Sequence, residues 1–125
     1  MSTSVQSSAA PAAVGPYSQA IRTGNLLFVS GQLPIDQTTG AFVSDDPVSQ
    51  MRQCLANIAH IAQAAGTDIS RTVKTTILVT DLSAFADINE EYAKVFAEPY
   101  PARACYEVSA LPKGAKVEVE AVLEI

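Results

Sequence analysis

An arginine in a strand-like segment is the clearest candidate for chemistry in this 125-residue chain. The stretch PYPARACYEV places Arg103 among small apolar residues, directly after two prolines that must end any preceding helix. Alternate residues of a strand share a face, so Arg103, Cys105 and Glu107 lie together, opposite the alanines and the tyrosine between them. A guanidinium stays charged at every relevant pH and binds carboxylates through two parallel hydrogen bonds, so this arginine could hold a small acid.

Carboxylates that could act with Arg103 lie in the last strand-like segment, residues 115–124. Small apolar residues alternate there with a polar face that carries Glu118, Glu120 and Glu124. The turn at residues 111–114 is short, so we expect this strand to pair with the strand of Arg103. If the two polar faces coincide, Arg103 and one carboxylate share a pocket. A half-solvated strand without chemistry and a structural Arg–Glu ion pair are the simpler interpretations.

Nucleophilic and metal chemistry have few candidate residues. Cys54 and Cys105 form no CxxC motif, and His60 is the single histidine. A zinc site needs three or four ligands at close spacing, which this inventory does not supply, so we expect no metal. Cys105 has no evident histidine to activate it and is expected to be a small packed residue. His60 is expected on the solvated side of a helix, with no serine placed to form a triad.

Two further residues have both a structural and a functional interpretation. Gly31, after Ser30, either lets a strand end sharply or lets a ligand approach the backbone. Asn89 falls on the apolar stripe of a predicted helix, between Phe85 and Tyr92. A buried amide there needs hydrogen-bond partners, whereas an amide at the edge of the stripe reaches solvent, and spacing alone favours the second.

Two helices and five strands are expected to position these residues. The first helix follows Asp46 as its N-cap and Pro47, runs with apolar residues at spacings of three and four, and ends at Gly66. The second runs from about Ser83 to Ala97 and must end before Pro99. Strands are expected at residues 17–22, 26–30, 71–80, 102–108 and 115–124, with a further turn at residues 37–40.

The order of these elements predicts an α+β fold, a mixed sheet with two helices packed on one face. The chain has the length of one domain, residues 1–125, and 48% of its residues are hydrophobic but only 17% are charged. This composition favours an oligomer in which other copies cover the second face of the sheet.

Composition and motifs also exclude several classes of function. The formal net charge is -5 and the eight basic residues do not cluster, which argues against nucleic-acid partners. No GxGxxG or Walker-type loop is present. The first fourteen residues contain neither a basic n-region nor a long apolar run, so we expect no signal peptide, no membrane partner and a cytoplasmic location.

Four segments in order resemble one known family. The stretches APAAVGPYSQAI, LLFVSGQLPID, YPARACYEV and LPKGAKVEVEAV are similar to the RidA/YjgF reactive intermediate deaminases, and the resemblance runs from about Ala10 to the C-terminus. It implies a chorismate-mutase-like fold, a homotrimer with sites in the clefts between subunits, and no cofactor or metal. It also implies hydrolysis of enamine or imine acids such as 2-aminoacrylate to 2-oxo acids and ammonia.

The same resemblance assigns roles to individual positions. Arg103 matches the arginine that binds the substrate carboxylate, Glu118 the acidic residue that handles the water, and Cys105 a position whose backbone carbonyl faces the substrate nitrogen or the water. Further matches to pocket residues are Tyr17, Ser30, Gly31 and Asn89. The Ser-rich SVQSSA replaces the usual first strand of the family, so residues 1–9 are expected to be flexible or a weak edge strand.

Two alternatives to an enzyme stay open. A non-catalytic trimeric module could use Arg103 to sense a small carboxylate with a regulatory purpose. Nucleic-acid cleavage or translational control is associated with some members of the family, and the acidic composition counts against it here.

Overall fold

In the computed structural model, which describes residues 1–125, the first helix begins and ends as predicted. Helix α1, Pro47–Ala64, is capped by Asp46, whose carboxylate accepts a hydrogen bond from the Ser49 amide at 3.0 Å. At the other end Gly66 adopts a φ of 81°, the left-handed conformation that closes helices. The apolar stripe of α1 is buried, with Met51, Leu55 and Ile58 at most 1% exposed.

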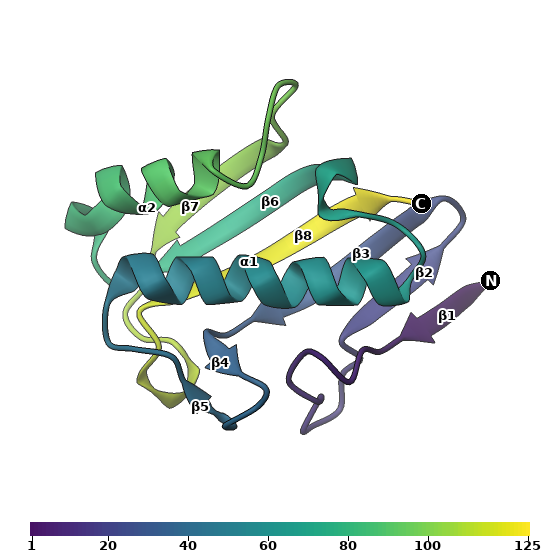
Figure 1. Ribbon diagram of the computed structural model, residues 1–125, viewed down its shortest axis with the longest axis horizontal. Helices are drawn as coiled ribbons and strands as arrows, with labels where there is room; N and C mark the ends of the chain where they lie inside the picture. Colours follow the sequence, from purple (N-terminus) through teal and green to yellow (C-terminus); the bar gives the residue numbers. More distant parts are fainter.

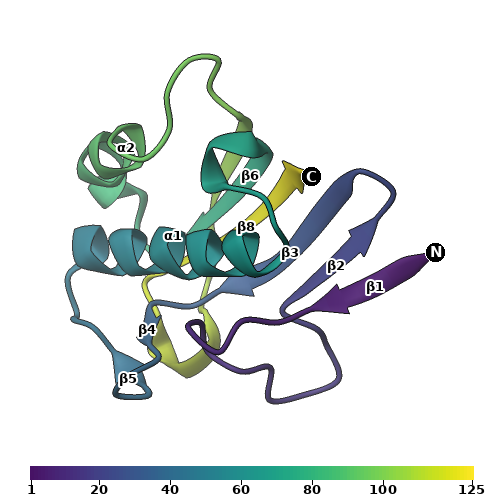
Figure 2. The same ribbon diagram turned by 45° about the vertical axis from the view of Figure 1, so that its right-hand side comes forward.

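The strands form one six-stranded sheet in the order β1-β2-β3-β8-β6-β7. Their bounds are Ser2–Val5 (β1), Ala20–Thr23 (β2), Leu26–Gln32 (β3), Thr72–Val79 (β6), Ala102–Glu107 (β7) and Val117–Glu124 (β8). Neighbours are antiparallel except β6 and β7, which are parallel and are connected through helix α2, Phe85–Ala93. A short hairpin, β4 (Ile35–Asp36) and β5 (Ala41–Phe42), flanks the predicted turn at residues 37–40 and lies next to α1, below it in Figures 1 and 2.

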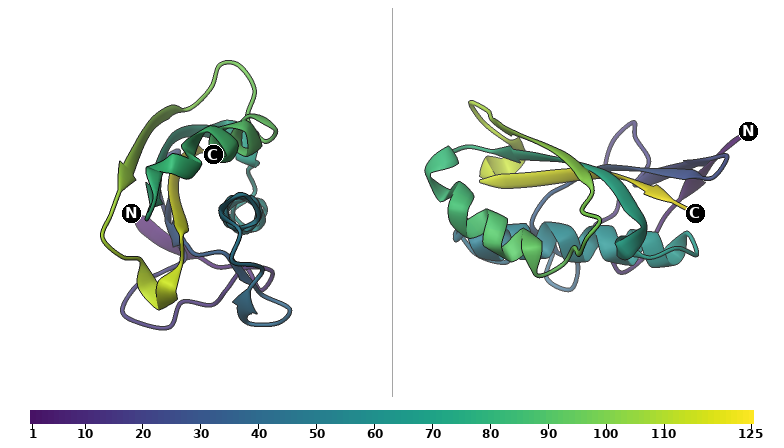
Figure 3. Two further views of the ribbon diagram at one scale, coloured as in Figure 1. Left: turned by 90° about the vertical axis from the view of Figure 1, so that its left-hand side faces the viewer. Right: turned by 90° about the horizontal axis from the view of Figure 1, so that it is seen from above.

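Both helices cover the same face of the sheet, which confirms the predicted α+β class (Figure 3). The core lies between this face and the helices, and β8 supplies every second residue to it, namely Val117, Val119, Ala121 and Leu123. The opposite face of the sheet carries no helix and leaves Phe28 44% and Tyr106 58% exposed. This uncovered face is called the open face below.

The expected pairing of β7 with β8 is wrong, because β6 lies between them. A strand that follows a helix can return parallel to the strand before that helix, and β6, α2 and β7 form such a crossover. The chain after β7 then passes over the end of β6 and re-enters the sheet between β3 and β6 as β8. Residues 111–114 are therefore part of a longer connection and not a hairpin turn.

The second helix and the last strand are shorter than predicted. A 3-10 turn at Leu82–Ala84 precedes α2, and α2 ends at Ala93 instead of Ala97. The amides of Val95 and Phe96 both donate to the Tyr92 carbonyl, and this closing turn directs Phe96 into the core. Strand β8 begins at Val117 because Lys113 and Gly114, with φ of 59° and 76°, bend the chain just before it.

Helix α2 is attached to α1 by a buried carboxylate. Glu91 is 5% exposed and accepts from Arg52 Nε at 2.7 Å and from Lys94 Nζ at 3.2 Å. The hydrogen bond from Arg52 is the main cause that holds the pKa of Glu91 below its usual value.

Among the helices of this chain, none combines the length and the apolar character that crossing a membrane requires.

Candidate functional site

Arg103 lies on the helix face of β7, where α2 supports its guanidinium. Its Nη1 donates to Asn89 Oδ1 at 2.6 Å, and its Cζ lies 4.9 Å from the centre of the Tyr92 ring and 5.4 Å from that of Phe85. These three helical residues are separated by four and three positions, so they share one side of α2. The guanidinium has no carboxylate partner within the chain, so its other N–H groups can donate hydrogen bonds to the carboxylate of a ligand.

A cavity of about 510 Å³ opens in front of this guanidinium. It is lined by Asn89, Tyr92, Ala93, Tyr100, Pro101 and Arg103, and is called the arginine pocket below. Asn89 is thus neither buried in the core nor simply at the solvated edge, because its amide oxygen holds the arginine. Tyr92 and Phe85 also belong to the site, but the sequence analysis missed them. Both lie on the apolar stripe of the helix, and spacing alone does not distinguish a site residue there from a core residue.

Cys105 follows Arg103 on the same face and packs against the core. Burial raises the pKa of its thiol, with Arg103 opposing the shift, so the thiol is protonated at neutral pH and is no activated nucleophile. The Val108 amide donates to the Val79 carbonyl, toward β6. Since backbone groups alternate along a strand, the N–H and C=O of Cys105 point to the free edge of the sheet, where the carbonyl can accept a hydrogen bond.

Glu118 lies on the open face, beside a bulge in β3. The pairing of β3 with β8 shifts register between Val29 and Gln32, so Ser30 and Gly31 sit in the bulge. A side chain at position 31 would collide with Glu118, because an added Cβ would lie 2.9 Å from its Cδ. Burial, and secondarily repulsion from Glu120, raises the pKa of Glu118. A carboxyl group in this environment can exchange a proton closer to neutral pH than a solvated one.

A second cavity, of about 390 Å³, includes Glu118 and is called the glutamate pocket below. Tyr17, Gly31, Gln32, Lys113 and Glu118 are among its lining residues. Tyr17 is 51% exposed and belongs to the loop before β2.

Ser30 does not line the glutamate pocket, and its hydroxyl is already used. Its Oγ donates to the Ser18 carbonyl at 2.6 Å, and its amide donates to the Gln19 carbonyl at 2.9 Å. These bonds attach the loop that carries Tyr17 to β3.

One chain does not bring Arg103 and Glu118 together. Thr75 of β6 pairs with both Arg103 and Ala121, and Leu78 pairs with both Glu118 and Tyr106. Paired residues share a face, and positions 75 and 78 are an odd number apart, so Arg103 and Glu118 lie on opposite faces. The condition for a pocket shared by Arg103 and Glu118, namely that the polar faces of their strands coincide, is therefore not met within the single chain.

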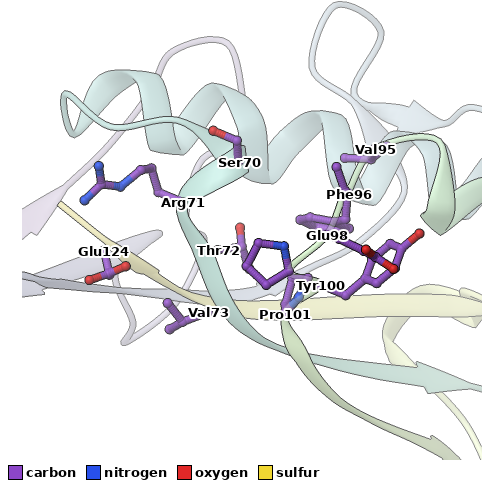
Figure 4. A pocket seen from close by; sticks show the side chains of 12 residues that line it. Ser70, Arg71, Thr72, Val73, Val95, Phe96, Glu98, Tyr100, Pro101 and Glu124 are labelled. Carbon is purple, nitrogen blue, oxygen red and sulfur yellow. The ribbon is translucent and has the colours of Figure 1, made fainter.

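The largest cavity, about 650 Å³, contains neither of these residues (Figure 4). Arg71 and Glu124 lie on one side of it and Glu98 and Tyr100 on the other, with Phe96 and Thr72 between them. It shares only Tyr100 and Pro101 with the arginine pocket.

His60 is half-buried on α1, away from all three cavities. No three His, Cys, Asp or Glu side chains gather where they could hold a metal ion.

Comparisons with known proteins agree on one family. The family model described as Endoribonuclease L-PSP matches residues 7–125. The chain is 68% identical over 116 residues to the RutC family protein y4sK of Sinorhizobium fredii, which covers 93% of this chain and 92% of the relative. It is 45% identical to a 2-iminobutanoate/2-iminopropanoate deaminase of Salmonella typhimurium, over 98% of this chain and 97% of the relative.

A solved structure has the same fold. The crystal structure of RidA from an Antarctic Psychrobacter species superposes with a TM-score of 0.94 at 45% identity, covering 98% of this chain and 99% of that one. Identity at this level over nearly the whole of each chain shows common family membership and not fold alone. The chain therefore belongs to the RidA/YjgF family, the Ribonuc_L-PSP family of the matching model.

Proposed function

We propose that this protein is a hydrolytic deaminase of reactive enamine and imine acids, such as 2-aminoacrylate, and that its sites form between the subunits of a homotrimer. The observation that carries the proposal is the separation of two complementary half-sites. Arg103, held by Asn89 and without a carboxylate partner, faces the arginine pocket. Glu118, with its raised pKa, faces the glutamate pocket on the other face of the sheet.

A neighbouring subunit supplies the half that one chain lacks. The open face, with Phe28 and Tyr106 exposed, is the surface on which copies would pack, since large apolar side chains gain most from burial. Packing of the open face against the free β7 edge of the next copy would carry Glu118, Gly31 and Tyr17 of one subunit toward Arg103 of another. Heterologous contacts of this kind close into rings, and a trimer is the ring that the family resemblance implies.

In the proposed reaction, Arg103 binds the substrate carboxylate and fixes the adjacent carbon. A proton from solvent adds to the terminal carbon and converts the enamine CH2=C(NH2)–COO⁻ to the protonated imine, which then accepts a water at its carbon. Glu118 takes a proton from the attacking water and returns it to the nitrogen. The C–N bond then breaks, ammonia leaves, and the remaining hydroxyl proton of the intermediate goes back to solvent as the carbonyl forms. The product is the 2-oxo acid, here pyruvate. Such proton transfer contributes roughly 10²–10⁴-fold in rate.

The remaining residues are assigned to the same pocket. The Cys105 carbonyl, at the free edge of β7, accepts a hydrogen bond from the substrate nitrogen or the water. Gly31 leaves room for the Glu118 carboxylate, and Ser30 holds the loop of Tyr17, which covers the substrate. Only substrate, water and these groups take part, so the proposal includes no cofactor or metal. The cytoplasmic location stays a prediction from the sequence.

The direct test compares turnover by the wild type, Arg103→Ala and Arg71→Ala. 2-Aminoacrylate is generated from serine by a dehydratase, and pyruvate formation is followed by absorbance. We expect acceleration by the wild type and by Arg71→Ala, which changes an arginine of the largest cavity, and none by Arg103→Ala. Full activity of Arg103→Ala would overturn the assignment. Glu118→Gln should lower kcat more than it raises KM.

Mixed trimers test whether the sites are shared. We expect Arg103→Ala and Glu118→Gln subunits, refolded together in equal amounts, to regain roughly a quarter of wild-type activity, because one interface in four then pairs an intact Arg103 with an intact Glu118. No recovery, with mixed trimers confirmed by mass spectrometry, would contradict a shared site. An inactive wild type that binds 2-oxobutanoate would instead support the alternative of a non-catalytic carboxylate-binding module.

A further inference from the structure

Tyr92 connects the interior of the sheet to the guanidinium of Arg103. Its hydroxyl and the Thr75 hydroxyl form a buried hydrogen bond of 2.8 Å, and its ring lies 4.9 Å from Arg103 Cζ. The residue is 3% exposed and Thr75 is fully buried, whereas Arg103 is exposed. One tyrosine therefore joins a buried position in the sheet to an exposed side chain.

The sheet register makes this connection specific. Thr75 and Arg103 are direct partners across the parallel β6–β7 pair, so their side chains leave the same face side by side. Tyr92 spans both, with its hydroxyl on Thr75 and its ring beside Arg103. The pair is buried, and no buried side-chain polar atom lacks a partner, so the Thr75 hydroxyl restrains the position of the ring. Burial also raises the pKa of Tyr92, which keeps the hydroxyl protonated and able to donate.

The position of the guanidinium depends on the ring. A cation is attracted to the face of an aromatic ring, and an exposed arginine otherwise samples many rotamers. The bond to Asn89 fixes one nitrogen, and contact with the Tyr92 ring restrains the rest of the group. Both constraints are needed before two parallel hydrogen bonds can reach a carboxylate, because that geometry requires a set plane as well as a set position.

We infer that Tyr92 and Thr75 are positioning residues for Arg103, which orient its guanidinium for the substrate carboxylate. This inference deepens the proposed function and rests on it for its kinetic consequences. A purely structural role is the competing explanation, since Tyr92 also contacts Phe96 with ring centres 4.6 Å apart. That role would change stability without a selective change in carboxylate binding.

Two substitutions release the ring with little change in shape. Thr75→Val and Tyr92→Phe each remove one hydroxyl of the buried pair, and Thr75→Ser keeps it. We expect the first two to raise KM for 2-aminoacrylate, and Kd for 2-oxobutanoate measured by calorimetry, by about 2- to 10-fold with kcat within about 2-fold. Thr75→Ser should behave as the wild type. Thr67→Val also removes one threonine hydroxyl, which donates to the Glu124 carbonyl away from the arginine and glutamate pockets; it is the matched control and should alter neither constant.

A measurement that needs no activity separates failure of this inference from failure of the proposed function. The rotation of the arginine guanidinium groups is followed by NMR of protein labelled with ¹⁵N-arginine. In the wild type we expect slow rotation for Arg103, and faster rotation in Thr75→Val and Tyr92→Phe. The signal of Arg52, which is fixed by Glu91, serves as the internal control and should not change.

The outcomes are distinct. If the wild type is inactive but the Arg103 signal responds as expected, the proposed function fails and the positioning role stands. If the wild type is active while KM, Kd and the Arg103 signal are unchanged in folded Thr75→Val and Tyr92→Phe proteins, the positioning role is refuted. Melting temperatures of every variant show that each one is folded.

Discussion

Gly31→Ala should disable Glu118 without removing any reacting group. Gly31 lies in the bulge of β3, and its φ is outside the left-handed region, so the backbone accepts alanine. An alanine Cβ would lie 2.9 Å from Glu118 Cδ and closer still to a carboxylate oxygen. The atoms that must give way are at the far end of a flexible side chain. The carboxylate therefore moves while the sheet stays in place.

The size of the effect follows from the displacement. Carbon atoms in contact prefer a separation of about 3.5–4.0 Å, so the carboxyl group must move by roughly 0.6–1.1 Å. A misplacement of about 1 Å costs on the order of 10²-fold in rate, so we expect kcat/KM to fall by about 10- to 100-fold, or roughly 1.4–2.7 kcal/mol in the barrier. Most of the loss should appear in kcat, because Arg103 and not Glu118 binds the carboxylate.

The assay is pyruvate formation from 2-aminoacrylate generated in place, with thermal unfolding of each variant in parallel. Gly15→Ala is the matched control, since Gly15 is the other glycine without a left-handed φ and its added Cβ would make an ordinary contact of 3.5 Å with Tyr17. We expect the melting temperature of Gly31→Ala to stay near that of the wild type, because alanine also reduces the freedom of the unfolded chain.

A double variant decides whether the loss acts through Glu118. In a Glu118→Ala background the carboxylate is absent, so Gly31→Ala should cause no further loss. Wild-type kcat/KM in Gly31→Ala would refute the reasoning that Glu118 must occupy its present position. A further loss in the double variant would show that alanine harms the site by another route.

Two further predictions concern stability. Burial, and secondarily repulsion from Glu120, raises the pKa of Glu118, so the folded protein binds this proton more tightly than the unfolded chain does. The free energy of unfolding therefore falls as the pH rises from the ordinary glutamate pKa of about 4.3 through the raised pKa of the folded protein. Glu118→Gln should therefore be more stable than the wild type toward urea at pH 8 and equal to it near pH 4; a difference that is the same at both pH values would contradict the raised pKa. Asn57 is fully buried and donates from Nδ2 to the Leu33 and Ile35 carbonyls at 3.0 and 3.1 Å, so Asn57→Ala should lower the free energy of unfolding by about 2–4 kcal/mol. Urea titration at fixed protein concentration measures this, and a loss below about 0.5 kcal/mol would show that water replaces the amide.

Local patterns were sufficient for the elements with strong start and stop signals. Asp46, Pro47 and Gly66 mark the ends of α1 because capping is an interaction between residues close in sequence. Alternation along β8 identified its buried face for the same reason. The end of α2 was misplaced because Phe96 turns toward the core, and that attraction comes from residues distant in the chain.

The strand order needed more than the local pattern. The short turn at residues 111–114 suggested a hairpin, yet the strand–helix–strand sequence of β6, α2 and β7 is itself typical of a parallel crossover. Giving weight to that second signal would have placed β7 beside β6. No local signal indicates that β8 inserts between β3 and β6, since this depends on which long-range packing buries most apolar surface.

The sequence by itself determined the α+β class, the limits of α1, the family and the identity of Arg103 and Glu118 as the charged residues of interest. Residue type and spacing carry the class, the helix limits and the interest of Arg103, since they act over a few positions; the family and the choice of Glu118 come from the resemblance of four ordered segments. Only the tertiary structure decided that Arg103 and Glu118 lie on opposite faces, that Gly31 makes room for Glu118, and that Thr75 and Tyr92 hold the arginine. Each of these relations joins residues that are distant along the chain, and the register of the folded sheet is what brings them together or keeps them apart.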